Sequence, residues 1–423
     1  MKILVANLGS TSLKWRLFDF SNNAERVLHK GSFERVSDYP RAIEDCLAQI
    51  KEGGHIASER ELAAVGFKTV IAKGVTGCVN LDDRVLAAME AYNNLAPAHN
   101  PPYITGIRLF ARRVPGVPLV GLFETAFYQW APEAMMRYAV PDTWHDIGVR
   151  RWGFHGASHK FIAERSAQLL GRDDVARRAQ NLYLDGGAMP VNKPDLRVIS
   201  CHLGGSSSIT GILNGVAIGN SLGMSPQSGL PHNNRVGDLD AEAIPYASKM
   251  LGITIEEGRR QLTKESGLKG LSGGLSNDVR DIREAAGKGN AKARLAIDVF
   301  VASARHWIGS YYFAMNGADA LVFTAGIGEN QTEIREAICA NLDQLGIVLD
   351  PGTNKTARAT EAVISAPDSR VKVMVIPTNE ELVVARETKR FLEQRQIETS
   401  RLTCHATRNT QHATLSRLST INH

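Results

Sequence analysis

The sequence predicts an α/β protein with two domains, and three observations lead to this fold class. The chain has 423 residues, too many for one hydrophobic core, so we expect two domains of roughly 150 to 250 residues. Apolar runs typical of strands alternate with helical patterns along the chain. The opening pattern NLGSTSL at 7–13 has an echo, HLGGSSSI, at 202–209. Either the echo is a coincidence of common turn residues, or two related halves face each other across a cleft.

Apolar runs predict the strands, and amphipathic periodicity between them predicts the helices. The predicted strands are 2–7, 13–20, 64–71, 117–123, 197–203, 207–213, 320–325 and 371–376. The predicted helices are 40–51, 82–92, 101–113, 156–170, 240–251, 278–287, 291–315, 331–345 and 379–394. We expect 178–197, rich in turn formers, to be a surface excursion. The tail from 396, dominated by Thr, Ser, His and Arg, is predicted to be disordered or loosely attached.

The composition indicates a soluble cytoplasmic protein. A formal net charge of +5 without a long Lys/Arg block argues against a nucleic-acid partner and is compatible with small anionic substrates. The cysteines are odd in number and none sits at metal-ligand spacing, which favours a reducing compartment. They are Cys46, Cys78, Cys201, Cys339 and Cys404. No stretch reaches the roughly 18 apolar residues of a membrane span, and the start has no cleavage site.

The two small-residue hairpins and one later turn are candidate anion sites. Backbone N–H groups and hydroxyls in the first bend, around Asn7 and Ser10, can face an anion, although neither hairpin matches the P-loop pattern. In FTAGIGENQTEIREAI, residues 323–338, an apolar strand runs into a glycine-rich turn and a helix is expected just after it. Such a turn suits a nucleotide, because the helix N-terminus favours phosphate; an ordinary strand-to-helix turn is the alternative.

Two histidines lie where catalysis is possible. His99 stands between two Pro-containing turns, and His155 stands between Phe154 and Gly156 at an expected helix start. The His155 imidazole is therefore expected at the mouth of a cleft, whereas His159 is expected on the helix surface. A histidine in a turn is also commonly a hydrogen-bonded structural residue.

Charged side chains in two further segments are candidates for phosphate and metal binding. Arg235 lies in the turn-forming stretch PHNNRVGDLD, and a guanidinium is the preferred group for a phosphoryl or carboxylate oxygen. Glu380 lies in the first turn of a predicted helix, where acidic residues are also favoured by the helix dipole alone. A Mg²⁺ site would need such a carboxylate, or one like Glu124.

Taken together, these segments resemble the acetate kinase family, the short-chain acyl kinases that include propionate and butyrate kinases. The matching segments are NLGSTSLKW, LAPAHNP, FETAF, RWGFHGASH, HLGGSSS, MSPQSGL, RVGDLD, LSGGLSNDVRDI, AGIGEN and PTNEEL. They occur in family order from residue 7 to about 395. The resemblance implies the fold shared with actin, sugar kinases and Hsp70-type ATPases, in which duplicated ribonuclease H-like domains enclose a central nucleotide cleft.

The same resemblance implies the domain boundaries, the cofactors and the assembly. The first domain is expected at 1–147 with 380–396 returning to it, the second at 148–379, and a polar tail at 397–423. ATP or ADP with Mg²⁺ or Mn²⁺ are the implied cofactors. A small carboxylic acid is the implied substrate, and a homodimer is the implied assembly.

The roles of single residues also follow from the resemblance. His155 and Arg235 match the transition-state stabilisers, His99 the active-site histidine, and Asn7 the position near phosphate and metal. The expected catalytic residues are His155, Arg235, Lys68, His99 and Glu124. The expected nucleotide-binding residues are Asn7, Ser10, Ser12, Lys14, His202, Gly204, Gly205, Asp278, Arg280, Gly326, Gly328 and Asn330. The expected acyl pocket is Val70, Ala98, Phe154 and Pro226, and the expected metal-binding residues are Asn7, Glu124 and Glu380.

The chain departs from the family pattern at four places. Lys68 replaces an active-site arginine and loses its planar fork. Glu124 replaces an aspartate and is one methylene longer, and HLGGSSS lacks the asparagine of the family's HLGNG. Ala98 stands where many members have leucine, which is expected to enlarge the acyl pocket.

The function expected from the sequence is reversible, ATP- and Mg²⁺-dependent phosphorylation of a short-chain carboxylic acid by direct in-line transfer. This would make the protein a phosphotransferase with a carboxyl group as acceptor. One alternative is a kinase of the same fold with another acceptor or donor, which the four departures favour. Another is a catalytically retired nucleotide-binding regulator, against which His99, His155, Arg235 and Glu380 are all retained.

Overall fold

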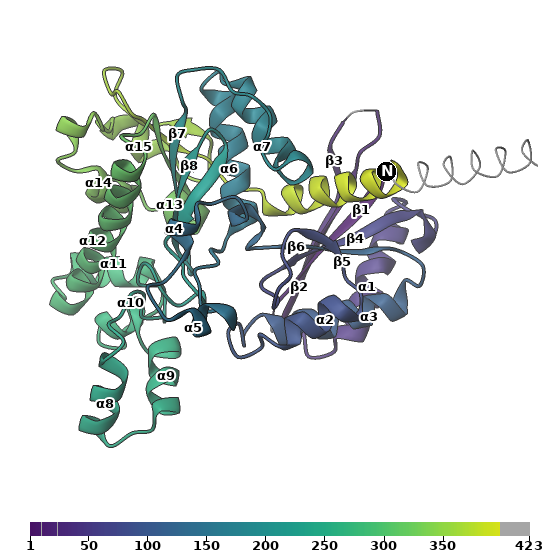
Figure 1. Ribbon diagram of the computed structural model, residues 1–423, viewed down its shortest axis with the longest axis horizontal. Coiled ribbons are helices and arrows are strands. Elements are labelled where there is room, and N and C mark those ends of the chain that lie inside the picture. Colours follow the sequence, from purple (N-terminus) through teal and green to yellow (C-terminus); the bar gives the residue numbers. More distant parts are fainter. Residues whose placement is uncertain (10, 23, 398–423) are drawn as a thin grey trace, which may run out of the picture.

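Two six-stranded sheets form the centres of two lobes in the computed structural model, which describes residues 1–9, 11–22 and 24–397 (Figure 1). The first sheet has the order β3-β2-β1-β4-β6-β5 and the second β11-β12-β10-β7-β8-β9. The first sheet consists of β1 (Lys2–Leu8), β2 (Ser12–Asp19), β3 (Arg26–Glu34), β4 (Leu62–Thr69), β5 (Cys78–Asn80) and β6 (Leu119–Phe123). The second consists of β7 (Arg197–His202), β8 (Ser208–Leu213), β9 (Val216–Asn220), β10 (Ala320–Thr324), β11 (Ala362–Val363) and β12 (Lys372–Val375).

The two sheets are built on the same plan. Each opens with an antiparallel hairpin, β1–β2 or β7–β8, whose first strand then pairs in parallel with a later strand, β4 or β10. The two segments that echo each other in the sequence are these two opening hairpins. The echo therefore marks equivalent positions in two related lobes.

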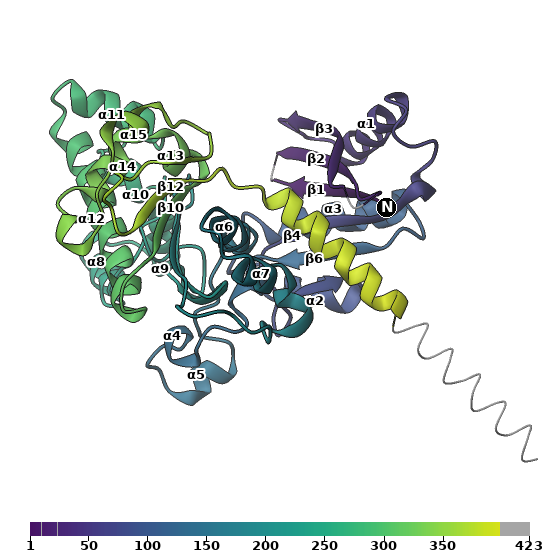
Figure 2. The same cartoon turned by 90° about the horizontal axis from the view of Figure 1, so that it is seen from above.

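Strand alternation explains how the first sheet is covered on both faces. Leu4 and Ala6 of β1 belong to the core under α1 (Tyr39–Glu52), α2 (Asp83–Glu90) and α3 (Asn100–Arg113). Ile3 and Val5 point the other way, as successive strand residues must, and pack with residues of the helix at 380–397. In Figure 2 this helix crosses the strands of the first sheet obliquely. The end of the described chain thus returns to the lobe in which the chain begins.

The second sheet is also sandwiched between helices. On one face lie α6 (Gly156–Leu169) and α7 (Asp173–Asp185), and on the other α12 (Ala291–Ala314) with α10 (Gly267–Leu271), α11 (Val279–Gly287), α13 (Ala325–Asn330) and α14 (Thr332–Cys339). Two helices, α8 (Ala243–Leu251) and α9 (Ile255–Lys264), pack on each other and project from this lobe as an arm (Figure 1). The remaining short elements are α4 (Glu133–Met136), α5 (Asp142–Asp146), α15 (Pro351–Thr356), η1 (Glu59–Glu61), η2 (Ala126–Tyr128) and η3 (Asp343–Leu345).

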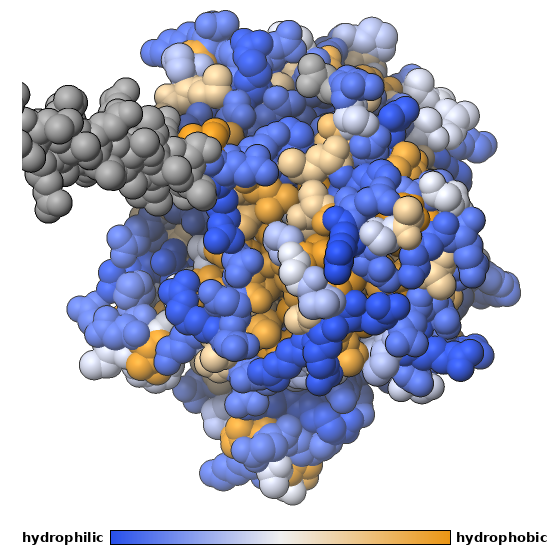
Figure 3. Space-filling view, turned by 90° about the vertical axis from the view of Figure 1, so that its right-hand side faces the viewer, coloured by the Kyte–Doolittle hydropathy of each residue, from blue (hydrophilic) through white to orange (hydrophobic). Residues whose placement is uncertain are grey.

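The outer surface mixes polar and apolar residues. In the view of Figure 3, hydrophilic residues surround apolar residues that gather in the middle of the face. Such exposure is ordinary, because apolar atoms supply roughly 55–60% of the accessible surface of folded proteins. Among the described residues, no helix has the length and apolar character needed to cross a membrane.

The predicted elements agree with the structure except in a few places. The surface excursion expected at 178–197 is wrong for its first part, because α7 continues to Asp185. The spacing of Val175, Ala179 and Leu182 gives α7 an apolar stripe, and Gly186 ends the helix in the left-handed region. Four of the described strands went unpredicted, β3, β5, β9 and β11. They are the edge strands of the two sheets, and none of them carries a long apolar run. The tail prediction for 397–423 lies almost wholly outside the described residues.

Candidate active site

Three charged side chains from distant parts of the sequence meet at one edge of the first sheet. Lys68 lies near the end of β4, and Glu124 follows directly after β6. These strands are parallel neighbours, and the Glu124 N–H donates to the carbonyl of Thr69 at 2.8 Å. Glu380 begins the 380–397 helix. The Lys68 Nζ lies 2.7 Å from Glu380 Oε2 and 3.1 Å from Glu124 Oε1, so one ammonium group bridges both carboxylates.

Burial and mutual attraction together set the ionisation of this cluster. Burial alone would lower the pKa of Lys68, but the charges of Glu124 and Glu380 outweigh it and raise the pKa well above its ordinary value. Burial raises the pKa of Glu124, and the negative charge of Glu380 adds to the rise. Burial also opposes ionisation of Glu380, yet Lys68 and His202 hold its pKa below the ordinary value. Lys68 is therefore charged at neutral pH, with Glu380 as its ionised partner.

The oxygen atoms of this cluster fit a divalent cation such as Mg²⁺. Glu124 Oε2 and Glu380 Oε1 are buried and have no hydrogen-bond partner within the described chain, an arrangement that is unfavourable unless a ligand satisfies them. Asn7 at the end of β1 adds an amide oxygen, which accepts a hydrogen bond from the Tyr103 hydroxyl at 2.5 Å. No group of three or more His, Cys, Asp or Glu with metal-binding geometry occurs among the described residues. Mg²⁺ needs no such cage, because it is usually held by one or two carboxylates together with water and phosphate oxygens.

The start of α6 places His155 beside this cluster. His155 caps α6 with φ 59° and ψ 31°, a left-handed conformation that is uncommon outside glycine and is enriched at functional sites. The N–H of Gly156 donates to the carbonyl of Glu124 at 3.0 Å. A Cβ on Gly156 would lie only 2.2 Å from that oxygen, so this position requires glycine. The backbone of Glu124 and the helix that carries His155 are thus in direct contact.

Three histidines lie together where α6 packs on the opening hairpin of the second sheet. The rings of His155 and His202 are stacked with centroids 4.0 Å apart. Burial lowers the pKa of His155 well below its ordinary value and that of His202 to about 4, so both are neutral at physiological pH. The prediction that His159 lies on the helix surface is wrong. His159 is fully buried, and both of its ring nitrogens lie 2.8 Å from serine hydroxyls.

Arg235 and His99 lie near the same cluster. Arg235 donates through Nη1 to the carbonyl of Pro226 at 2.5 Å. Burial lowers the pKa of Arg235 to about 10, which leaves it charged at neutral pH. His99 caps α3 and is exposed on one side. Partial removal of the ring from water lowers the pKa of His99 to about 4, and the charges of Arg235 and Lys68 add to this shift.

The predicted acyl-pocket residues are brought together only in part. Val70 and Phe154 belong to one small apolar cluster with Ala96 and Leu222. Pro226 is buried and contacts Arg235 through its carbonyl. Ala98 is exposed and lies outside that cluster, so the structure does not place it with the others.

A cavity of about 350 Å³ lies in the second lobe between the β7–β8 hairpin, α11 and α13. Its walls are Gly204, Gly205, Asn233, Asp278, Val279, Arg280, Gly326, Ile327, Asn330 and Gln331. Among the residues that the structure describes, six of the twelve expected to bind nucleotide therefore line one cavity. Gly328 does not line this cavity, and its N–H donates to the carbonyl of Leu203 at 3.0 Å. The segment AGIGEN is itself the short helix α13, a correction to the expected turn with a helix after it.

The predicted nucleotide-binding residues of the first hairpin that the structure describes do not line the second-lobe cavity. Ser12 and Lys14 lie on β2, and Lys14 pairs across the sheet with Glu34 at 3.0 Å, on an exposed edge. Ser10 lies outside the described residues. Asn7 accepts a hydrogen bond from Tyr103. Burial raises the pKa of Tyr103, which is also affected by the nearby charges of Lys68, Glu124 and Glu380.

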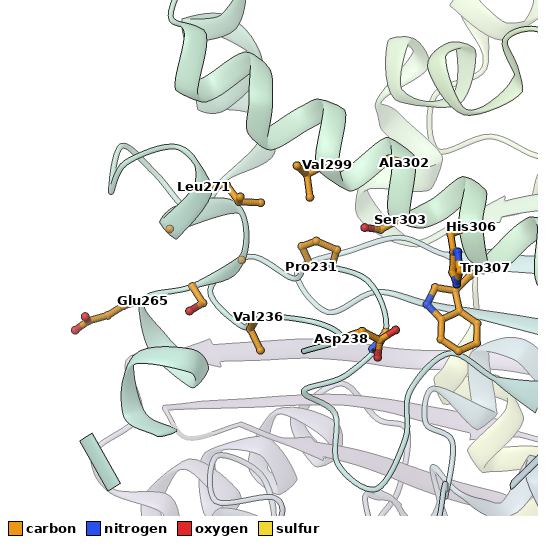
Figure 4. Close-up of a pocket in the computed structure, with 14 residues that line it drawn as sticks. Pro231, Val236, Asp238, Glu265, Leu271, Val299, Ala302, Ser303, His306 and Trp307 are labelled. Atoms are coloured by element: carbon orange, nitrogen blue, oxygen red, sulfur yellow. Dashed lines mark hydrogen bonds between the residues drawn. The ribbon is translucent and has the colours of Figure 1, made fainter. Parts of the chain in front are cut away.

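A second cavity, of about 620 Å³, lies behind the segment that carries Arg235 (Figure 4). Pro231, Val236 and Asp238 face it from this segment, and Val299 and Trp307 face it from α12. None of the site residues expected from the sequence lines it.

Comparisons with known proteins agree with this geometry. A family model described as the Acetokinase family matches residues 29–386. The chain belongs to this acetate kinase family. It is 40% identical to the acetate kinase of Natranaerobius thermophilus over 93% of this chain and 100% of that protein. It is also 40% identical to the acetate kinase of Methanosarcina thermophila over 93% of this chain and 97% of that protein.

Solved structures of acetate kinase relatives share the fold. The acetate kinase of Porphyromonas gingivalis superposes with a TM-score of 0.80 at 34% identity, covering 92% of this chain and 99% of that one. A propionate kinase from Francisella tularensis superposes with a TM-score of 0.78 at 32% identity, covering 91% and 98%. The expected two-domain α/β kinase fold is thereby confirmed, as is the expectation that the protein is a phosphotransferase with a carboxyl group as acceptor.

The sequence did not predict three serines that contact the histidines or two residues that line the second-lobe cavity. Ser200, Ser208 and Ser158 contact the histidines, and Asn233 and Gln331 line the cavity of the second lobe. Strand alternation could have indicated Ser200, because it shares a face with His202 two residues later. Asn233 lies in an irregular loop, and no local pattern indicates which way it points.

Proposed function

We propose that this member of the acetate kinase family transfers the γ-phosphoryl group of ATP reversibly to the carboxylate of a short-chain carboxylic acid, giving an acyl phosphate and ADP. One observation carries the proposal. Two buried carboxylates with unpartnered oxygens, Glu124 and Glu380, lie next to a charged lysine and beside two stacked neutral histidines. Such a set suits the charge of a phosphoryl group and its metal.

Each of the charged and histidine side chains of the site would have its own role in an in-line transfer. A carboxylate is already a competent nucleophile, so positioning and charge neutralisation are what the protein has to supply. Arg235 retains its positive charge and would stabilise negative charge that develops on the phosphoryl oxygens. His155 would donate a hydrogen bond to the same oxygens. Lys68 would keep the two carboxylates in place and add positive charge near the acid.

The metal is assigned to the oxygens that lack partners. Asn7, Glu124 and Glu380 would hold Mg²⁺ or Mn²⁺, which when bound neutralises charge on the nucleotide phosphates. The cavity lined by Gly204, Asp278 and Gly326 would hold the adenosine part of ATP or ADP. The apolar cluster around Val70 and Phe154 would take the short apolar end of the acid.

A hydroxamate assay tests the reaction. The purified protein is incubated with ATP, Mg²⁺ and hydroxylamine across formate, acetate, propionate, butyrate and substituted acids, because hydroxylamine traps acyl phosphates as coloured products. A signal with at least one acid supports the proposal and names the substrate. Silence across the whole panel, with nucleotide binding intact, would favour another acceptor or a retired regulator.

Replacing single glutamates tests the metal assignment. Glu380→Gln should raise the Mg²⁺ concentration needed for half-maximal activity by at least tenfold, because one carboxylate ligand is lost. Glu381→Gln is the matched control, since Glu381 is the next residue and pairs only loosely with Arg16 at 3.8 Å. Equal Mg²⁺ dependence in both variants would remove Glu380 from the metal site.

We further propose that two copies of the chain associate through the α8–α9 arm and act in the cytoplasm. Tyr246, Met250 and Leu251 are each about two-thirds exposed on this arm (67%, 64% and 66%), and gathered apolar exposure typically marks an interface. Light scattering should give about twice the 46.0 kDa chain mass, and Leu251→Asp should shift the mass to that of one chain. The described cysteines are all unpaired, which fits a reducing compartment.

A further inference from the structure

A ladder of serines and histidines connects α6 to the opening hairpin of the second sheet. On α6, His155, Ser158 and His159 share one face, as residues three and four apart do. On the sheet, Ser200 and His202 share a face of β7, and Ser208 of β8 lies directly opposite His202. Helix periodicity and strand alternation therefore bring these six side chains into one layer.

Within this layer, four hydrogen bonds of 2.8 Å form two chains. In the first chain, Ser200 Oγ contacts His159 Nδ1, His159 Nε2 contacts Ser208 Oγ, and Ser208 Oγ contacts His155 Nδ1. In the second chain, Ser158 Oγ contacts His202 Nδ1. All three serines and His159 are fully buried.

Counting donors and acceptors gives the direction of the first chain. A neutral imidazole has one N–H donor and one acceptor nitrogen, and a hydroxyl has a single proton to donate. If His155 donated from Nδ1, the protons of the chain would run toward Ser200, whose hydroxyl would then need an acceptor. The Ser200 hydroxyl has no hydrogen bond other than that to His159 among the described residues. A buried hydroxyl without an acceptor is disfavoured, so the protons must run the other way.

In this direction every buried group is satisfied. Ser200 donates to His159 Nδ1, His159 donates from Nε2 to Ser208, and Ser208 donates to His155 Nδ1. The Nδ1 of His155 is then an acceptor, so its proton is on Nε2. The same counting applies to the second chain, because the Ser158 hydroxyl has no hydrogen bond other than that to His202 in the described chain.

We propose that Ser208 and Ser158 are positioning residues that hold the stacked rings of His155 and His202 in the Nε2–H tautomer, so that each ring offers an N–H donor to the transferred phosphoryl group. The proposal rests on the proposed role of His155 in phosphoryl transfer. It explains how a histidine that is neutral at physiological pH can bind an anion: the serine, rather than proton uptake, provides the donor at the far ring nitrogen. A lone pair at Nε2 would instead repel a phosphoryl oxygen.

Nuclear magnetic resonance of the full chain tests the tautomers directly. The protein is labelled with ¹⁵N at histidine, and the ring nitrogens of His155 and His202 are assigned by the loss of signals in His155→Gln and His202→Gln. The expected result is a protonated Nε2 and an unprotonated Nδ1 on both rings near pH 7. A protonated Nδ1 on His155, or a doubly protonated ring, would overturn the proposal.

Single serine variants then test the cause. Ser208→Ala should shift His155 to a mixture of tautomers and lower kcat about tenfold or more, with the KM for ATP changed less than twofold. Ser208→Thr keeps the hydroxyl and should restore the Nε2–H signal. Ser158→Ala should alter His202 and leave His155 unchanged. An unaltered His155 tautomer in Ser208→Ala would contradict the proposal.

A matched control separates this role from general destabilisation. Ser166 is equally buried on α6, but its hydroxyl donates to the carbonyl of Ile162 at 2.6 Å. Ser166→Ala should leave both tautomers and kcat unchanged. The resonance experiment measures the tautomers in the absence of catalysis. It therefore tests the proposal even if no acid in the hydroxamate panel is phosphorylated.

Discussion

At the residue scale, the departures of this chain from its family are coupled to one another. The family pattern has arginine where this chain has Lys68 and aspartate where it has Glu124. Lysine reaches less far than arginine and glutamate reaches one methylene further than aspartate. The shorter cation and the longer carboxylate compensate each other in length, and Lys68 Nζ lies 3.1 Å from Glu124 Oε1. Lys68 also contacts Glu380 at 2.7 Å, so it is held by two carboxylates and is not free to point at the acid alone.

This compensation predicts non-additive mutations. Lys68→Arg and Glu124→Asp should each lower kcat/KM, because each alone misfits the contact, whereas the double variant should recover most of the activity. Contacting pairs typically show coupling of about 0.5–3 kcal/mol. Steady-state kinetics on the four proteins measures this coupling. Effects that simply add would show that the two substitutions are independent.

A buried histidine outside the catalytic cluster predicts how stability depends on pH. His232 is fully buried, its Nδ1 accepts the N–H of Ser207 at 2.9 Å, and burial lowers its pKa to about 3. Unfolding returns the pKa to about 6.5, so the unfolded chain binds this proton first as pH falls. The stability from this group is complete above pH 6.5 and is lost progressively as pH falls toward 3.

Between pH 7 and pH 5, this one group should lower the free energy of unfolding by about 2 kcal/mol. Urea unfolding at the two pH values measures the loss in the wild type and in His232→Gln, which lacks a titrating group at this position. The variant should lose about 2 kcal/mol less over this range. Identical losses in the two proteins would show that His232 does not titrate in this way.

At the element scale, α6 links the two parts of the active site. Its first residue, Gly156, touches the backbone of Glu124, and its first two turns carry His155 and His159. The sequence pattern RWGFHGASH predicts that a helix begins here, and the structure confirms it at Gly156. The pattern could not indicate that His159 is buried, because α6 packs on β7 and η2 and so buries most of its circumference.

Alanine substitutions at two glycines test how closely α6 packs against the backbone of Glu124. Gly156→Ala should lower the free energy of unfolding by about 1–3 kcal/mol, because the new methyl group would meet the Glu124 carbonyl. It should also lower kcat, since His155 moves with α6. Gly309→Ala in α12 is the control. A Cβ there meets no atom within 4 Å, and the variant should gain about 0.5–1 kcal/mol from the better helix propensity of alanine. Both values follow from denaturant unfolding, and equal effects would contradict the close contact.

At the scale of the whole molecule, a buried ionic network connects α6 with the 380–397 helix. Lys160 Nζ lies 2.7 Å from Glu387 Oε1, and both side chains are almost completely buried. Arg390 also pairs with Glu387 at 2.6 Å. His155 caps the first helix and Glu380 begins the second, and both are residues of the candidate active site. The relative placement of the two helices is thus held by a buried ion pair in the interior.

This network predicts a larger effect for one substitution than for two. Lys160→Met should lower the free energy of unfolding by about 3–5 kcal/mol, because it leaves Glu387 buried with one partner fewer. Lys160→Met combined with Glu387→Met should be less destabilising than Lys160→Met alone, because the Glu387 carboxylate is then no longer left in the interior without Lys160. Denaturant unfolding of the three proteins gives the comparison. A double variant less stable than the single one would show that the pair itself is strongly favourable.

The predicted domain boundaries belong to this scale as well and stay predictions. The return of residues 380–396 to the first lobe agrees with the packing of Val383 and Val384 against Ile3 and Val5. The division at 147–148 falls between α5 and α6, in a segment with little regular structure. The unfolding measurements above would test whether the two lobes separate as units.

The amino-acid sequence by itself determined the inner strands of both sheets, the equivalence of the two hairpins and the family, because these depend on local periodicity and on short motifs. It also indicated most residues of the second-lobe cavity, since they lie in a few glycine-rich turns. Only the tertiary structure decided that Lys68 bridges Glu124 and Glu380, which is 312 residues away from it in the chain. It likewise decided that His159 is buried and that Ser208 lies between two histidines. Side-chain partners depend on which faces of distant elements meet, and no local pattern contains that information.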